Sequence, residues 1–371
     1  MQLHVAQAEP SLLPPHANHV PHAPGVYFDL PMADYHADPS LGSTDLKALL
    51  VHPAIYWQRS SMNPARQENS DTPAKKMGRA LHSLVLEGEL AFAKAFIEEP
   101  TPAGFPDALA SAEDLRNYVR RHLLKGAGTT KAEMAKAIKK HDPTVQIWDD
   151  IKSLFDAMVV RSGLEVLKPE AMAEVCSAAA NITLNPHLAR AFKGGAPEVS
   201  VFWTDENGLP CKARHDYVKP KTLVNLKRFA NQRQRPVDIA IHLAIAEYRY
   251  DVQAKHYLDS YPHLFAAAKE GRVFGPCALP EGWEDQLADP EAITYTWIFH
   301  QMDGPAVTVG RQLSLHSSAL NRATRDVAKA KAIYADCIAK YGTERWVSDE
   351  PIADLLDTDL PVWMREELEV L

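Results

Sequence analysis

The chain has 371 residues, which is enough for one large domain or for a core domain with insertions. Its hydrophobic content of 46% is that of a globular protein, and no apolar run reaches the roughly 18 residues that cross a bilayer, so no membrane association is expected. The net charge of −8 is unlike that of proteins that coat DNA without specificity, because such proteins are usually basic. Any contact with DNA must therefore come from a local basic surface.

The N-terminal segment and the cysteines bear on the location of the protein. Residues 1–24 are rich in His and Pro and lack the basic start and apolar stretch of a secretory signal, so we interpret them as a flexible tail. The four cysteines are scattered and form no CxxC pair, which argues against a disulfide framework, a zinc site or an iron–sulfur cluster. They are Cys176, Cys211, Cys277 and Cys337. A reducing cytoplasm is the expected location.

The hydrophobic pattern predicts helices in the first half of the chain and strands in the centre. Apolar residues at helical spacing predict helices at about 45–51, 77–96, 148–167, 169–181, 236–261 and 318–341. The first begins near Asp45, with Ser43 or Thr44 as its N-cap. Alternating or apolar runs predict strands at 198–204, 211–218, 222–227, 293–301 and 306–314. The first three form an antiparallel meander with a hairpin turn at Asn207-Gly208.

Residues 108–143 are expected to form a small helical insertion. Ser111 caps its first helix with Asp114 three residues later, and a second helix covers about 131–140. The unit is rich in Lys and Arg. Its basic side chains either contact phosphates or form a solvated surface, and both interpretations stay open.

The residues that could carry chemistry lie in the central strands. Metal-dependent cleavage of a phosphodiester needs oxygen ligands for a divalent ion and a cation near the attacking water. Asp216 ends the second expected strand, and Asn225-Leu226-Lys227 lies in the third. Positions i and i+2 of a strand face the same way, so Asn225 and Lys227 should point into one site while Leu226 packs in the core.

Taken in order, the motifs resemble the signature of the exodeoxyribonuclease VIII (RecE-like) group of PD-(D/E)XK nucleases, which phages and bacteria encode. The matching pieces are Gly78-Arg79-Ala80-Leu81-His82, Glu198, Arg214-His215-Asp216, Asn225-Leu226-Lys227 and Gln253-Ala254-Lys255-His256-Tyr257. Ser43 to Lys47 with His52-Pro53, and Leu360-Pro361-Val362-Trp363, resemble the two ends of that family. Each piece alone is unspecific, whereas their order and spacing over residues 25–365 are specific.

The resemblance implies a restriction-endonuclease-like α/β fold, with a mixed sheet flanked by helices, and a metal site. It implies that His82 and Asp216 are metal ligands, and that Glu198 assists at the metal or at a phosphate. The metal would be Mg²⁺ or Mn²⁺, with two ions in an active form. Taken alone, His82 is a surface or core histidine and Asp216 is a turn residue.

The resemblance also implies contacts to DNA. Lys227 would orient the attacking water and stabilise phosphate charge, and Gln253 and Tyr257 would line the DNA path. Arg214 and Arg228 would lie near the phosphates; the simpler interpretation of Arg228 is a solvated loop residue. The 108–143 unit resembles the SAP-like helical hairpins inserted in these exonucleases, where Arg120 and Lys131 are the candidate contacts.

Asn225 departs from the family pattern, which has Asp at this position. An amide offers one neutral carbonyl oxygen instead of a carboxylate, so the affinity for a divalent cation should fall. Three explanations are open: an introduced substitution, a natural loss of cleavage, or compensation by another carboxylate.

The resemblance implies a Mg²⁺-dependent exonuclease that digests double-stranded DNA from its 5′ ends in recombination, impaired by Asn225. Its partners would be DNA ends, a single-strand annealing protein and further copies of the chain. The alternatives are a protein that binds DNA ends without cutting them and a protein-interaction module on a nuclease-derived fold.

Overall fold

The computed structural model describes residues 21–67, 71–276, 281–302, 306–347 and 351–360. A seven-stranded mixed sheet runs through the molecule in the order β7-β1-β4-β5-β6-β8-β9. Its strands are β1 (Gly25–Tyr27), β4 (Ala196–Thr204), β5 (Pro210–Lys219), β6 (Thr222–Phe229), β7 (Val273–Phe274), β8 (Thr294–Gln301) and β9 (Thr308–Leu313). Strands β4, β5 and β6 form an antiparallel meander, and β6 pairs in parallel with β8. The mixed sheet built on a meander is thereby confirmed.

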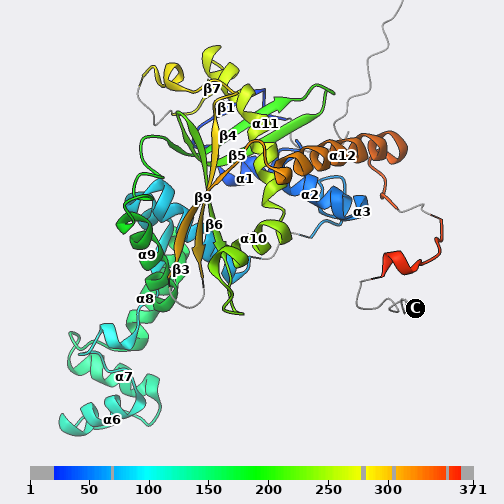
Figure 1. Ribbon diagram of the computed structural model, residues 1–371. Helices are drawn as coiled ribbons and strands as arrows, with labels where there is room; N and C mark the ends of the chain where they lie inside the picture. The colour runs from blue at the N-terminus through cyan, green and yellow to red at the C-terminus, as the bar shows by residue number, and fades with distance from the viewer. Residues whose placement is uncertain (1–20, 68–70, 277–280, 303–305, 348–350, 361–371) are drawn as a thin grey trace, which may run out of the picture.

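Helices cover both faces of this sheet (Figure 1). The larger core lies against α2 (Ser43–Val51), α10 (Val237–Glu247), α11 (Tyr250–Lys269) and α12 (Ser318–Tyr341). The smaller core lies against α4 (Pro73–His82), a π-helical turn η1 (Ser83–Glu87) and α9 (Pro169–Leu184). The remaining short elements are α1 (Met32–Ala37), α3 (Pro53–Arg59), α5 (Glu89–Ala95), η2 (Pro102–Gly104), η3 (Trp283–Gln286) and η4 (Asp357–Asp359).

Local signals explain the hairpin between β4 and β5. The Asp205 side chain accepts hydrogen bonds from the backbone N–H groups of Asn207 and Leu209, at 3.0 and 2.9 Å. Gly208 has a φ of 77°, which a glycine adopts without a steric penalty. The turn predicted at Asn207-Gly208 is therefore present.

A separate helical unit projects from one end of the molecule (Figure 1). It starts and ends at a small parallel sheet of β2 (Phe96–Glu98) and β3 (Glu165–Leu167) and contains α6 (Ala112–Arg121), α7 (Lys131–His141) and α8 (Trp148–Ser162). Its own core consists of Leu115, Met134, Ile138 and Ile147. The capping box predicted at Ser111 and Asp114 is formed by both of its hydrogen bonds.

The long helix predicted over 236–261 is wrong, because the chain forms two helices there. The break lies at Arg249, whose φ of 50° is left-handed and cannot continue an α-helix. Its guanidinium pairs with Asp251 and with Asp326 on α12. These ion pairs hold the start of α11 in place.

Three other predicted helices have different ends. The helix predicted over 77–96 begins at Pro73 and passes into a π turn, where the carbonyl of Ser83 accepts the N–H of Gly88. The helix predicted over 148–167 stops at Gly163, in a left-handed C-cap, and the residues after it form β3. The helix α2 starts at Ser43, so the residue before it, Gly42, takes the N-cap position that was predicted for Ser43 or Thr44.

The N-terminal segment contacts the fold where it is described. His22 donates its backbone N–H to Asp38 at 2.7 Å, and its ring stacks on Phe202. Residues 1–20 lie outside the described part of the chain. Cys176 and Cys211 are free thiols, Cys337 is half-buried on α12, and Cys277 lies outside the described residues. Over the described residues, none of the helices combines the length and apolar character that a bilayer span requires.

Candidate active site

The site is built around Asp216, at the point where β5 and β6 separate. The two strands pair at Tyr217 with Val224, and the backbone pairing stops beyond these residues. The Asp216 carboxylate then accepts the backbone N–H of Leu226 at 2.8 Å. Leu226 is 1% exposed and packs in the smaller core, as the strand periodicity predicts. Asn225 and Lys227, on either side of Leu226, therefore share the opposite face of β6.

Glu198 lies opposite Asp216 on the neighbouring strand. The flanking pairs, Pro197 with Tyr217 and Val199 with His215, set this register. Glu198 has a φ of 49°, a strained conformation for a residue with a Cβ atom. Its carboxylate accepts the Nε–H of Arg214 at 2.9 Å. The strained backbone therefore directs Glu198 into the group of ionisable side chains.

His82 reaches the two carboxylates from the last residue of α4. Its Nδ1 lies 3.5 Å from a Glu198 oxygen, and its Nε2 lies 3.8 Å from Asp216 Oδ2. The π turn that follows His82 widens the helix at this point, a feature that often occurs at functional sites. The structure thus brings together His82, Glu198 and Asp216, which are far apart in the sequence.

Asn225 is a buried polar side chain of the site. It is 1% exposed, and among the described residues neither its amide nitrogen nor its carbonyl oxygen has a hydrogen-bond partner. An unsatisfied buried polar group costs about 1–3 kcal/mol of stability. Such a group is kept where a ligand, an ion or water completes it.

Lys227 occupies the same face of β6, beside the aromatic ring of Tyr250. Its Nζ lies 5.2 Å from the ring centroid, within the range of a cation–π interaction. Burial lowers the pKa of Lys227, and the carboxylates of Asp216 and Glu198 oppose this effect.

Gln253 and Tyr257 lie on the face of α11 that points to Asp216. The Gln253 amide donates to the Tyr257 hydroxyl at 3.1 Å, as their i, i+4 spacing allows. Burial and the charge of Asp216 raise the pKa of Tyr257. The hydroxyl therefore remains protonated and able to donate a hydrogen bond.

The charges of the site act on one another. Burial raises the pKa of Asp216, against the opposite influence of Lys227 and His82. Burial would also raise the pKa of Glu198, but His82 and Arg214 outweigh it and lower that pKa. Burial disfavours the charged form of His82, yet the two carboxylates raise its pKa above the ordinary value.

The metal that the resemblance implies can be tested against these donors. Within the described part of the chain, no three His, Cys, Asp or Glu side chains converge as ligands of one ion. The donors that fit are the Asp216 carboxylate, the His82 ring and the unpartnered carbonyl oxygen of Asn225. Glu198 is less available, because Arg214 and His82 already engage it. The residues thus fit a single divalent ion with one carboxylate among its closest ligands.

The predicted DNA contacts differ in their availability. Arg214 pairs with Glu198, Arg228 pairs with Glu174 at 2.9 Å, and Lys131 pairs with Asp149 at 2.7 Å. Arg120 is exposed on α6 and, among the described residues, forms no ion pair. Arg120 is therefore the residue of this group whose charge is directed to solvent.

Sequence reasoning missed three residues of the site. Tyr250 lies three residues before Gln253 on the same face of α11, a spacing that could have indicated it. Lys47 of α2 approaches the same Tyr250 ring, with its Nζ 5.5 Å from the ring centroid. Glu87, in the π turn, has its pKa raised by burial and by the charge of Glu198. No local signal marks Glu87, whereas Lys47 belongs to the Ser43 to Lys47 stretch that resembles the family but was given no role of its own.

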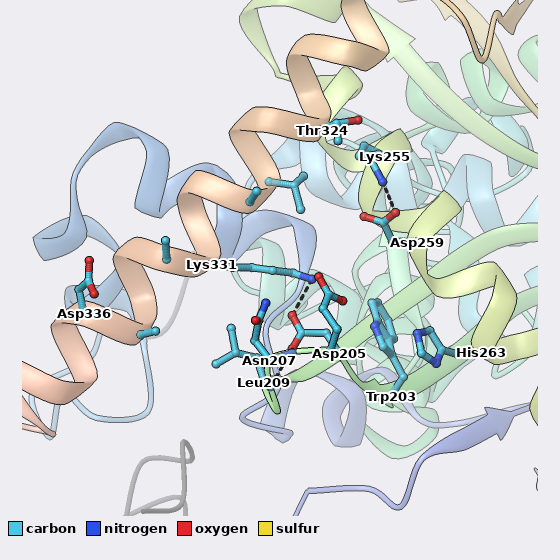
Figure 2. A pocket seen from close by; sticks show the side chains of 15 residues that line it. Trp203, Asp205, Asn207, Leu209, Lys255, Asp259, His263, Thr324, Lys331 and Asp336 are labelled. Atoms are coloured by element: carbon cyan, nitrogen blue, oxygen red, sulfur yellow. Dashed lines mark hydrogen bonds and ion pairs between the residues drawn. The ribbon is translucent and has the colours of Figure 1, made fainter.

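A cavity of about 520 Å³ lies elsewhere, between α11, α12 and the β4–β5 hairpin (Figure 2). Lys255, Asp259 and His263 line it from the face of α11 that points away from Tyr257. Lys331 of α12 pairs there with Asp205 at 2.8 Å. None of the residues around Asp216 lines this cavity, so it is not the candidate active site.

A family comparison agrees with the fold. No curated protein matches the sequence. Among solved structures, the chain is similar to a candidate exonuclease from Eubacterium rectale, with 11% sequence identity and a TM-score of 0.43, over 88% of this chain and 97% of the other. This likeness is too distant to carry an argument about activity. Residues 44–268 match the family described as a PDDEXK-like domain of unknown function, DUF3799. The match covers more than half of the chain and includes every residue of the site, and the chain therefore belongs to this family of nuclease-like domains.

Proposed function

We propose that this protein hydrolyses the phosphodiester backbone of DNA with a divalent metal, and that Asn225 weakens this activity. The observation that carries the proposal is the meeting of Asp216, His82 and Lys227 around the unpartnered Asn225 at the split between β5 and β6. Structural cores need no such arrangement, because a buried amide without partners destabilises them.

Each side chain has a role that follows from its position. Asp216, Asn225 and His82 would hold Mg²⁺ or Mn²⁺, which supplies a Lewis acid and lowers the pKa of bound water. The Lys227 ammonium stabilises the negative charge of the phosphate and orients the water that attacks it. Tyr257 and Gln253 donate hydrogen bonds to the DNA strand beside the scissile bond.

The finer form of the proposal is digestion of double-stranded DNA from its 5′ ends during recombination. Support for it comes from the motif resemblance alone, as it does for a second metal ion, an annealing partner, a homo-oligomer and a cytoplasmic location.

The projecting unit supports contact with duplex DNA more directly. Arg116, Arg120, Arg121 and Lys125 are exposed there and form no ion pair with any described residue, in a chain whose net charge is negative.

A second candidate function is binding of DNA ends without cleavage. Asn225 favours it, because an amide in place of a carboxylate removes one negative charge beside the cation. The two candidates share the DNA surface and differ only in turnover.

The test is cleavage of a linear duplex with Mg²⁺ or Mn²⁺ by the natural chain and by Asn225→Asp. We expect Asn225→Asp to cut at least tenfold faster, and the addition of Lys227→Met to abolish the gain. Asn321→Asp, an exposed site on α12, is the matched control and should behave like the natural chain. Salt-dependent binding by both forms without cleavage by either supports the second candidate. Neither binding nor cleavage refutes both and favours a protein-interaction module.

A further inference from the structure

Two lysines from distant parts of the chain converge on one aromatic ring. Lys227 of β6 and Lys47 of α2 place their ammonium groups 5.2 and 5.5 Å from the centroid of the Tyr250 ring. Tyr250 is the first residue of α11 and is half-buried, as are both lysines. The three elements meet at the edge of the candidate active site. The proposed function gives Lys227 a role at the scissile phosphate, whereas it gives Lys47 none.

Within the described residues, the charge of Lys47 is compensated only weakly, by Asp251. In the described part of the chain, Lys47 makes neither an ion pair nor a hydrogen bond. The nearby cations Lys227 and Arg249 repel it, and Asp251, the nearby anion, is held by the Arg249 guanidinium. Burial, followed by these repulsions, lowers the pKa of Lys47 to about 7.

The two lysines that are buried more deeply than Lys47 have partners. Lys212 donates hydrogen bonds to the backbone carbonyls of Tyr35 and Asp38, and Lys331 pairs with Asp205. A half-buried ammonium stabilised only by an aromatic face is costly unless an anion completes it. The contrast indicates that Lys47 is placed for a ligand rather than for packing.

The position of Lys47 relative to the carboxylates indicates which anion it meets. Asp216 and Glu198 act electrostatically on Lys227, whereas neither acts appreciably on Lys47. Lys227 is therefore the lysine nearer to the metal-binding side of the site, and Lys47 approaches the same Tyr250 ring farther from the carboxylates. An anion bound at Lys47 would therefore be a neighbour of the scissile phosphate and not the scissile phosphate itself.

The ring that both lysines approach is fixed in place. Arg249, in its left-handed conformation, anchors the start of α11 through Asp251 and Asp326. The Tyr248 ring stacks on Tyr250 with centroids 5.7 Å apart. The fold thus holds in place the aromatic ring that both ammonium groups approach.

We propose that Lys47 binds the DNA backbone phosphate next to the one that Lys227 contacts, with the Tyr250 ring beside both ammonium groups. This inference rests on the proposed function, because it assumes that the site takes a nucleic-acid strand. It assigns to Lys47 a role in binding and positioning the strand.

The test measures binding of a labelled 30-base-pair duplex to the natural chain by fluorescence anisotropy at several salt concentrations. We expect Lys47→Met to weaken binding about tenfold and to reduce the slope of log K against log salt by about 0.9, the value for one lost phosphate contact. Lys47→Arg should retain most of the affinity. Lys329→Met, at an exposed lysine of α12, is the matched control and should bind like the natural chain.

A second readout separates a direct contact from a structural effect. Acetylation of individual lysines by acetic anhydride is followed by mass spectrometry with and without the duplex. We expect the duplex to protect Lys47 and to leave Lys329 unchanged. If the natural chain binds DNA but Lys47→Met binds equally well with the same slope, or Lys47 is not protected, the inference is overturned while the proposed function stands. A natural chain that does not bind DNA overturns both.

Discussion

The Asp216 carboxylate bonds to the backbone N–H of Leu226, at the point where β5 and β6 cease to pair. This one contact closes the gap that the separating strands would leave in the backbone hydrogen bonding. It also fixes the carboxylate between Asn225 and Lys227, so the residue expected to hold a cation is oriented before any cation binds. The separation of β5 and β6 therefore leaves the Leu226 N–H available to the Asp216 carboxylate, and this hydrogen bond places the carboxylate in the site.

Replacing Asn225 by Leu should stabilise the fold. The substitution removes two buried polar atoms that have no partners, and we expect the free energy of unfolding to rise by about 1–2 kcal/mol. Urea unfolding measures this change. Asn321→Leu, on the exposed surface of α12, serves as the comparison. A loss of stability in Asn225→Leu would indicate that ordered water satisfies the amide.

Removing Lys331 should be strongly destabilising. The side chain of Asp205 is 1% exposed and would be left as an unpaired buried charge, at a cost of about 3–5 kcal/mol. Thermal unfolding of Lys331→Met, compared with Lys329→Met, checks this. The double variant with Asp205→Asn should recover part of the loss. Equal stability of the two single variants would show that the ion pair contributes little.

His256 should make the protein sensitive to acid. Burial lowers its pKa from 6.5 to about 4, although its bond to the Lys212 carbonyl opposes this. Between these pH values the unfolded chain binds a proton that the folded chain does not, so stability falls as the pH decreases through this window, by up to about 1.4 kcal/mol per pH unit. His256→Gln should flatten the dependence measured by urea unfolding from pH 4 to 7. The exposed His187→Gln should retain the natural slope.

Ser111 should stabilise the projecting unit alone. Its hydroxyl accepts the Asp114 N–H at 3.0 Å, so Ser111→Ala should cost about 1 kcal/mol. Hydrogen exchange should accelerate over α6 and α7 and remain unchanged in β5 and β6. Faster exchange throughout the chain would show that the unit and the sheet unfold together.

Much of the fold could be predicted because its signals are local. The helix over 318–341, the turn at Asn207-Gly208 and the capping box at Ser111 each depend on residues within a few positions of one another. The alternation around Leu226 likewise predicts which side chains of β6 face the site. These patterns need no knowledge of distant segments.

The features that were missed depend on distant contacts. Nothing near Arg249 indicates a left-handed residue, because its conformation is held by Asp326, 77 residues away in the sequence. Strands β2 and β3 are three residues each and pair across the whole projecting unit. Arg228 lies beside the nuclease motif, yet its charge holds Glu174 of α9. Lys47 belongs to a predicted helix, but its direction is set by the docking of α2.

The pairing of β2 with β3 makes the projecting unit a modular addition. Both connections between the unit and the seven-stranded sheet pass through the two-stranded sheet of β2 and β3. The hydrophobic residues of the unit pack among themselves. The unit could therefore be lengthened, exchanged or deleted during evolution without altering the geometry at Asp216. The reach of the protein along a bound partner and the chemistry at its centre can change independently of each other.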